Sequence, residues 1–195
     1  MKKYKELSFA CPEAQLVRLA TVLQSGFHVD GTVGDSIFSL LSAIPGFTKT
    51  YIAEEIHTVF LNGDALDDME TVVYGPHATI ALAGAMPGLA GAIVRKGSPW
   101  GALRKTRAVE HRDHSGDHVD VLIKLFNTVA VDKGADLFTG GVRINTRDLV
   151  HFLELRPSLL YSFVDITLDV DPLEADKLVE AIASFDQLLV CVRRL

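Results

Sequence analysis

The sequence has few cysteines and no pairing pattern among them. Its 195 residues include two cysteines, Cys11 and Cys191, which lie far apart and in no spacing typical of a metal site. A disulfide framework is therefore not implied. Such cysteine usage is typical of a reducing compartment, and we expect a cytoplasmic protein.

Long apolar runs and excess positive charge are also missing. No segment reaches the ~18 consecutive apolar residues that a membrane-spanning helix needs. The basic start of the chain is not followed by the apolar stretch of a signal peptide, because Pro12 and Glu13 interrupt it. The net charge is −6, which argues against broad binding of nucleic acid or of an anionic membrane.

The common catalytic motifs are absent as well. The sequence contains no P-loop, no dinucleotide-binding glycine fingerprint and no Gly-x-Ser-x-Gly elbow. Apolar residues make up 48% and charged residues 23%, which is ordinary for a globular protein. Whether the protein is an enzyme stays open on these grounds.

Local patterns in the first half predict strands and helices in alternation. Asp35 is placed to cap a helix, and Asn62-Gly63 is typical of a tight turn between strands. Pro12–Ser25 fits a helix, with a strand as the alternative for Leu16–Leu19. The other predicted elements are strands at Tyr4–Phe9, Phe27–Asp30, Thr58–Leu61 and Ala78–Leu82 and a helix at Ile37–Leu41.

The second half ends in a predicted strand, helix and strand. Ser162–Val170 alternates apolar and polar residues, which is typical of a strand with one buried face. Asp171 and Pro172 resemble a helix cap and first turn. The apolar run Gln187–Val192 predicts a buried strand. Two strands joined by a helix normally pair in parallel, and we expect that here. The remaining predictions are a strand at Val119–Leu125 and a helix at Arg147–Leu155.

Part of the first half resembles the β-grasp (ubiquitin-like) fold, and especially the small sulfur carriers of thiamin and molybdopterin synthesis. The residues that carry the resemblance are Thr32–Asp35, Val59–Gly63 and Ile80–Leu82, within about residues 28–91. The carriers end in Gly-Gly, whereas this chain continues past Met86–Gly91. The resemblance therefore implies a fold used as a binding or interaction module rather than sulfur carriage.

These patterns predict an α+β protein, with a β-grasp-like first half followed by an α/β lobe that ends in a strand–helix–strand unit. The predicted lobes are 1–107 and 119–195. A polar, histidine-rich loop or linker at 108–118 separates them, because Glu110–His118 holds no apolar side chain.

A Gly/Ala-rich segment with a basic flank is the first candidate site. Glycine lets a backbone approach a ligand closely, and nearby cations attract phosphate or carboxylate groups. The alternative is a packing surface of small residues whose charges face water. The predicted ligand- or partner-binding residues are Met86, Leu89, Arg95, Lys96, Trp100 and Arg104.

Three histidines form the second candidate site. His111, His114 and His118 share a polar stretch with Asp113 and Asp117. Imidazole and carboxylate groups are suitable ligands for a divalent transition metal such as zinc. The alternative is a solvated loop that is rich in histidine.

The sequence thus supports two functional predictions. The first is a noncatalytic module that binds a protein partner or a small anionic ligand, and exposed Met86, Leu89 and Trp100 would also suit a homodimer. The second is a small metal-dependent or anion-handling enzyme that draws ligands from the three histidines.

Overall fold

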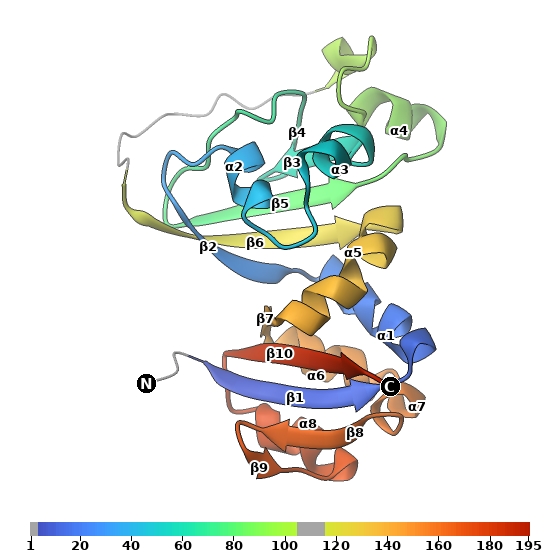
Figure 1. Cartoon of the computed structure of the whole chain (residues 1–195). Helices are drawn as coiled ribbons and strands as arrows, with labels where there is room; N and C mark the ends of the chain where they lie inside the picture. The colour runs from blue at the N-terminus through green and yellow to red at the C-terminus, as the bar shows by residue number, and fades with distance from the viewer. Residues whose placement is uncertain (1–3, 105–115) are drawn as a thin grey trace. The chain divides into compact units, whose positions relative to one another are not determined.

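The computed structural model describes residues 4–104 and 116–195 and has an α+β fold (Figure 1). The chain forms two compact units. The terminal unit consists of residues 1–27 and 131–195, and the central unit consists of residues 28–130. The lobes predicted from the sequence, 1–107 and 119–195, have different boundaries from these two units. Local sequence patterns do not reveal that the first strand of the chain pairs with the last.

The terminal unit is built on a sheet in the order β7-β10-β1-β8-β9. Its strands are β1 (Lys5–Cys11), β7 (Val142–Asn145), β8 (Val164–Leu168), β9 (Asp171–Pro172) and β10 (Gln187–Arg194). Its helices are α1 (Glu13–Leu19), the 3-10 helix η1 (Ala20–Gln24), α6 (Thr146–Glu154), α7 (Pro157–Leu160), α8 (Ala175–Ile182) and most of α5 (Asn127–Gly140). In Figure 1, α6 lies behind β10 and β1, and α8 lies behind β8.

The first and last strands of the chain form the centre of this sheet. β1 runs parallel to β10, with Lys5 opposite Leu188, and antiparallel to β8. β8 is therefore antiparallel to β10 and separated from it, so the predicted parallel pairing of these two strands is wrong. Leu7, Phe9 and Val190 are buried, and the ring of Phe9 stacks on Phe163 at 4.0 Å.

The helix after β8 begins later than predicted. Asp171 and Pro172 pair back onto β8 as the short strand β9, opposite Leu168 and Thr167. The residue that precedes α8 is Glu174, and its side chain forms no capping hydrogen bond. The prediction that Asp171 caps this helix is wrong, because backbone pairing with β8 holds the residue in a strand.

The central unit has the sheet order β4-β3-β5-β6-β2. β5 and β6 are parallel, whereas β3 is antiparallel to both β4 and β5. The strands are β2 (Phe27–Thr32), β3 (Thr58–Leu61), β4 (Asp64–Leu66), β5 (His77–Ala83) and β6 (His118–Phe126), and the helices are α2 (Ile37–Ser42), α3 (Lys49–Glu54), α4 (Gly88–Val94) and the 3-10 helix η2 (Gly101–Leu103).

Most local predictions for this unit are confirmed. The predicted helix and strands are α2, β2, β3 and β5, and Asn62 and Gly63 adopt positive φ angles in the turn from β3 to β4. The cap of α2 is Ser36 rather than Asp35: the Ser36 hydroxyl accepts a hydrogen bond from the Ser39 N–H at 3.1 Å. Asp35 instead accepts from the Thr32 N–H at 2.8 Å and closes the preceding turn.

Two glycines of the small-residue segment allow close packing. A Cβ added at Gly91 would lie 2.1 Å from the Met86 carbonyl oxygen, and one added at Gly84 would lie 2.2 Å from the Thr128 hydroxyl. At these two positions the lack of a side chain therefore lets the backbone lie close to Met86 and Thr128. None of the helices in residues 4–104 and 116–195 is long and apolar enough to cross a membrane.

Candidate functional site

The central unit contains a hollow of about 480 Å³, which we call the Lys96 hollow. Four segments that are separate in the sequence contribute to it: α2, α3, the chain after β4 and the chain after α4. Its lining residues are Phe38, Ile52, Ala53, Asp67, Met69, Lys96 and Gly97. The set combines an apolar lining with one cation and one anion.

Two short helices and one loop supply the apolar lining. Thr48 caps α3 by accepting from the Tyr51 N–H, and Ile52 on that helix is 1% exposed. The Phe38 N–H of α2 donates to the Met69 carbonyl at 2.9 Å, which fixes the loop against the helix. Backbone hydrogen bonds and caps therefore hold these side chains in place.

Lys96 brings an ammonium group to this lining. Its backbone N–H donates to the His57 carbonyl at 2.7 Å, and its Nζ donates to the Ile52 carbonyl at 3.3 Å. Among the described residues, no carboxylate lies within ion-pair distance of this Nζ. Burial lowers the pKa of Lys96, because desolvation disfavours the charged form.

Arg104 holds the segment that carries Lys96. The Arg104 side chain is only 8% exposed, and its Nε donates to the Ile93 carbonyl at 2.8 Å. One terminal nitrogen donates to the Arg95 carbonyl, and the other forms an ion pair with Asp67 at 2.8 Å. The guanidinium therefore fastens α4 and the turn after it to the loop after β4.

The negative charge of Asp67 is balanced by neighbouring groups. Its carboxylate accepts from Arg104 and also from the Gly97 N–H at 2.7 Å. Partial burial pushes the pKa of Asp67 upward, but the two hydrogen bonds and the Arg104 charge outweigh burial and leave that pKa below its ordinary value. Asp67 is thus an ionised partner of Arg104, not the counter-ion of Lys96.

The six predicted binding residues have different environments. Lys96 lines the hollow, whereas the guanidinium of Arg104 is engaged by three acceptors and Arg95 is exposed. Met86 lines a separate apolar hollow of about 260 Å³ with Phe60 and Phe126. Leu89 on α4 is 69% exposed, and Trp100, which precedes η2, is 54% exposed.

The predicted metal ligands are not brought together in the described part of the chain. His111 and His114 lie outside the described residues. His118 starts β6, and its Nε2 lies 2.9 Å from the Asp30 carboxylate with both side chains exposed. Within residues 4–104 and 116–195, no three His, Cys, Asp or Glu side chains form a group that could hold a metal.

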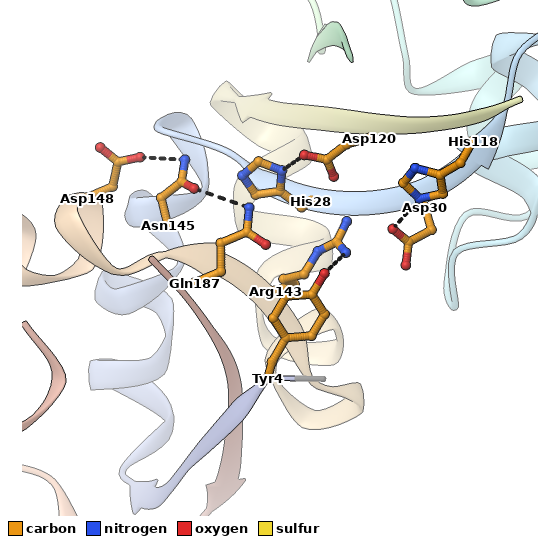
Figure 2. A network of polar contacts seen from close by, with 9 residues as sticks. All are labelled: Tyr4, His28, Asp30, His118, Asp120, Arg143, Asn145, Asp148 and Gln187. Carbon is orange, nitrogen blue, oxygen red and sulfur yellow. Dashed lines mark hydrogen bonds and ion pairs between the residues drawn. The ribbon is translucent and has the colours of Figure 1, made fainter. Parts of the chain in front are cut away.

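A second histidine–aspartate pair was not identified from the sequence. His28 Nδ1 lies 2.8 Å from the Asp120 carboxylate, and the His28 side chain is 9% exposed (Figure 2). The His28–Asp120 and Asp30–His118 contacts both join β2 to β6. The residue numbers rise along one strand as they fall along the other, so the two strands are antiparallel. The alternation of histidine and aspartate was visible in both strands, but nothing local showed that the strands are neighbours.

The terminal unit has its own polar contacts, also drawn in Figure 2. Arg143 on β7 is 7% exposed and donates to the Tyr4 hydroxyl at 2.6 Å. The Gln187 amide donates to the Asn145 side chain at 3.5 Å, and Asn145 donates to Asp148 at 3.4 Å. These contacts tie β7 to the start of β10 and of α6.

The chain was compared with protein-family models, with curated proteins and with solved structures. None of these comparisons gives a significant match. The Lys96 hollow and the exposed apolar side chains of the same unit are the features of the structure that bear on function.

Proposed function

We propose that the central unit binds a small organic anion with an apolar body, and that the Lys96 ammonium contacts the anionic group. One observation carries the proposal: a half-buried ammonium faces an apolar hollow and has no carboxylate partner among the described residues. A charge in such surroundings is costly, and a bound anion would relieve that cost.

The surrounding contacts support this assignment. Asp67 lines the same hollow, but its carboxylate already forms an ion pair with Arg104 and accepts a hydrogen bond from the Gly97 N–H. Phe38, Ala53 and Met69 line the hollow and are at least partly exposed, so they offer surface for an apolar body. A few polar groups on an apolar lining are typical of small-molecule sites.

The test uses 8-anilinonaphthalene-1-sulfonate, which joins an aromatic body to a sulfonate. Its fluorescence is titrated against the wild-type protein, Lys96→Met and Lys177→Met. The second variant makes the same charge change on an exposed lysine that is paired with Glu174. We expect Lys96→Met to weaken binding at least about tenfold, which is ~1.4 kcal/mol, and Lys177→Met to leave it unchanged.

Equal affinity in all three proteins would overturn the proposal. Circular dichroism of each variant confirms that the fold is intact. Competition by benzoate but not by benzyl alcohol would show that the anionic group is required.

A protein partner is the second proposal for this unit. Leu89, Trp100 and Leu103 are all more than half exposed on the segment of α4 and η2. Neighbouring exposed apolar side chains are typical of interaction surfaces. The β-grasp relationship of this unit and a cytoplasmic location are further proposals that agree with such a module.

The metal-dependent enzyme stays a prediction that rests on His111, His114 and His118. Elemental mass spectrometry of untagged protein purified without chelator tests it. About one ion per chain, lost when all three histidines are replaced by alanine, would support a metal site; a substoichiometric metal content would reject it.

A further inference from the structure

The lysines of this protein lie in contrasting environments. Lys5 and Lys177 each place their Nζ 2.6 Å from a carboxylate oxygen, of Asp169 and Glu174 respectively. Hydrogen bonding to those carboxylates raises the pKa of both lysines and keeps them protonated. Lys96 instead donates to a neutral carbonyl at 3.3 Å inside the hollow.

A lysine in the second kind of environment is suited to nucleophilic chemistry. Only the neutral amine carries the lone pair that attacks a carbonyl carbon, and removal of water from around the side chain favours the neutral form. Desolvation does lower the pKa of Lys96, in the direction opposite to that of Lys5 and Lys177. The apolar lining can also hold the substituent of a carbonyl compound beside the amine.

We propose that Lys96 Nζ forms an imine with an aldehyde or ketone whose apolar substituent occupies the hollow between Phe38, Ile52 and Met69. This inference goes beyond the proposed anion binding at the same hollow. It needs a carbonyl group and the neutral amine of Lys96, whereas the anion would bind the ammonium form.

The step is balanced without an oxidant or a reductant. The ammonium first gives one proton to solvent, and the lone pair of the amine then forms a C–N bond to the carbonyl carbon. The C=O π electrons move to oxygen, and proton transfer from nitrogen to that oxygen gives a carbinolamine. Protonation of the hydroxyl and loss of water break the C–O bond, while the nitrogen lone pair forms the second bond to carbon. The product is the protonated imine (iminium), which becomes the neutral imine when the nitrogen loses a proton to solvent.

The contacts around Lys96 favour a defined position for this amine. Arg104 holds the carbonyl of Arg95 and the Asp67 carboxylate, and Asp67 in turn holds the Gly97 N–H. The residues on both sides of Lys96 are thereby fixed. Restricting the backbone of the nucleophile lowers the entropic cost of reaching the transition state.

The experiment traps the imine by reduction. Wild-type protein is incubated at neutral pH with benzaldehyde and sodium cyanoborohydride, and the rate of modification at each lysine is followed by peptide mass mapping. We expect Lys96 to react at least about tenfold faster than Lys5 and Lys177, because its amine is more easily deprotonated and is not held by a carboxylate. Lys96→Arg should remove the fast site and leave the rates at Lys5 and Lys177 unchanged.

A pH series separates nucleophilicity from simple access. The rate at Lys96 should level off at a lower pH than the rates at Lys5 and Lys177, because its amine is deprotonated earlier. A rate at Lys96 no faster than at these two lysines, or with the same pH profile, would overturn the imine proposal.

The two proposals can fail separately. If 8-anilinonaphthalene-1-sulfonate binding depends on Lys96 but reductive trapping is slow there, the anion site stands and the imine proposal is wrong. If trapping is fast and selective but binding of the sulfonate does not need Lys96, the imine stands and the anion proposal is wrong.

Discussion

At the scale of single residues, burial decides how the two cysteines and Lys96 behave. Cys11 is fully buried at the end of β1, whereas Cys191 on β10 is half-buried. Burial raises the pKa of the Cys11 thiol, and the charge of nearby Glu13 raises it further. The same physical cause lowers the pKa of Lys96, because desolvation always disfavours the charged form.

The cysteines should differ in reactivity. In the native protein we expect iodoacetamide to alkylate Cys191 well before Cys11, because the thiolate is the reactive species and Cys11 is both inaccessible and hard to ionise. Peptide mass mapping after partial alkylation measures the two rates. In 6 M guanidinium chloride the difference should vanish, and equal rates in the native protein would contradict this expectation.

Lys96 should affect stability in a pH-dependent way. Below the folded-state pKa the lysine is charged in both states, and the folded state bears the cost of its burial. Between that pKa and the higher unfolded-state pKa the unfolded chain binds more protons, so the free energy of unfolding rises with pH.

Lys96→Met removes this dependence. At pH 7 we expect the variant to differ from the wild type by no more than about 0.5 kcal/mol in the free energy of unfolding, because the side chain is only half-buried. Urea unfolding of both proteins at pH 7 and pH 10 measures this difference in the free energy of unfolding. The wild type should gain stability relative to the variant as the pH rises, and a gain in the opposite direction would show that the sign is wrong.

At the scale of elements, the segment from α4 to η2 depends on one arginine and on close packing. Arg104 reaches two backbone carbonyls and Asp67, and α4 packs against the Met86 carbonyl at Gly91. Small residues therefore allow close packing at Gly84 and Gly91. The basic flank has two roles, since Arg104 maintains structure and Lys96 faces the hollow.

Arg104→Met should loosen this segment. The variant leaves the Ile93 and Arg95 carbonyls and Asp67 without their donor, and we expect a loss of about 1–3 kcal/mol in the free energy of unfolding. Arg95→Met is the matched control, because it removes the same charge from an exposed side chain of the same segment. Chemical denaturation measures both, and equal effects would exclude the proposed role of Arg104.

The Arg104–Asp67 pair also gives a pH dependence. Because the folded-state pKa of Asp67 lies below its unfolded value, the pair stabilises the protein above the unfolded pKa. That contribution is lost as the pH falls through the folded pKa. In Asp67→Asn this part of the acid-induced loss of stability should be absent, and an unchanged acid profile would argue against the pair.

Gly91→Ala should destabilise α4 through overpacking. The added methyl group would meet the Met86 carbonyl oxygen at 2.1 Å, so α4 must move, and we expect a cost of about 1–3 kcal/mol. Gly140→Ala is the control, because an added Cβ meets nothing within 4 Å there. Thermal unfolding of both variants gives the comparison, and a higher Tm for Gly91→Ala than for Gly140→Ala would be contrary to expectation.

At the scale of the whole molecule, the two units differ in how their strands are connected. The terminal unit joins the first and last strands of the chain in parallel, through β1 and β10. The central unit is a continuous segment, in which the parallel pair β5 and β6 is flanked by β3 and β2. The candidate site and the exposed apolar side chains around Trp100 both belong to the central unit.

Trp100 reports on the proposed interaction surface, because it is the only tryptophan in the sequence. In dilute protein we expect strong quenching of its fluorescence by acrylamide, since it is 54% exposed. If the predicted homodimer buries this surface, quenching should weaken as the protein concentration rises, and Leu89→Ser with Leu103→Ser should abolish the change. Quenching that is equal at all concentrations, together with a monomeric mass by light scattering, would reject the homodimer.

The sequence by itself determined the α+β class and most of the local elements. Helical spacing at Ile37–Leu41, β-branched runs such as Thr58–Leu61 and the Asn62-Gly63 turn depend on neighbours a few residues away, so these predictions are confirmed. Lys96 was also among the predicted binding residues, because the adjacent Gly97 and the basic flank are visible locally.

Only the tertiary structure decided the rest. The pairing of β1 with β10, the insertion of β1 beside β8 and the His28–Asp120 contact join residues that are distant in the chain. The environment of Lys96 likewise depends on Ile52 and on the Arg104–Asp67 pair, which come from different elements. Desolvation and ion pairing are set by what surrounds a side chain in space, and that is fixed only when the elements pack.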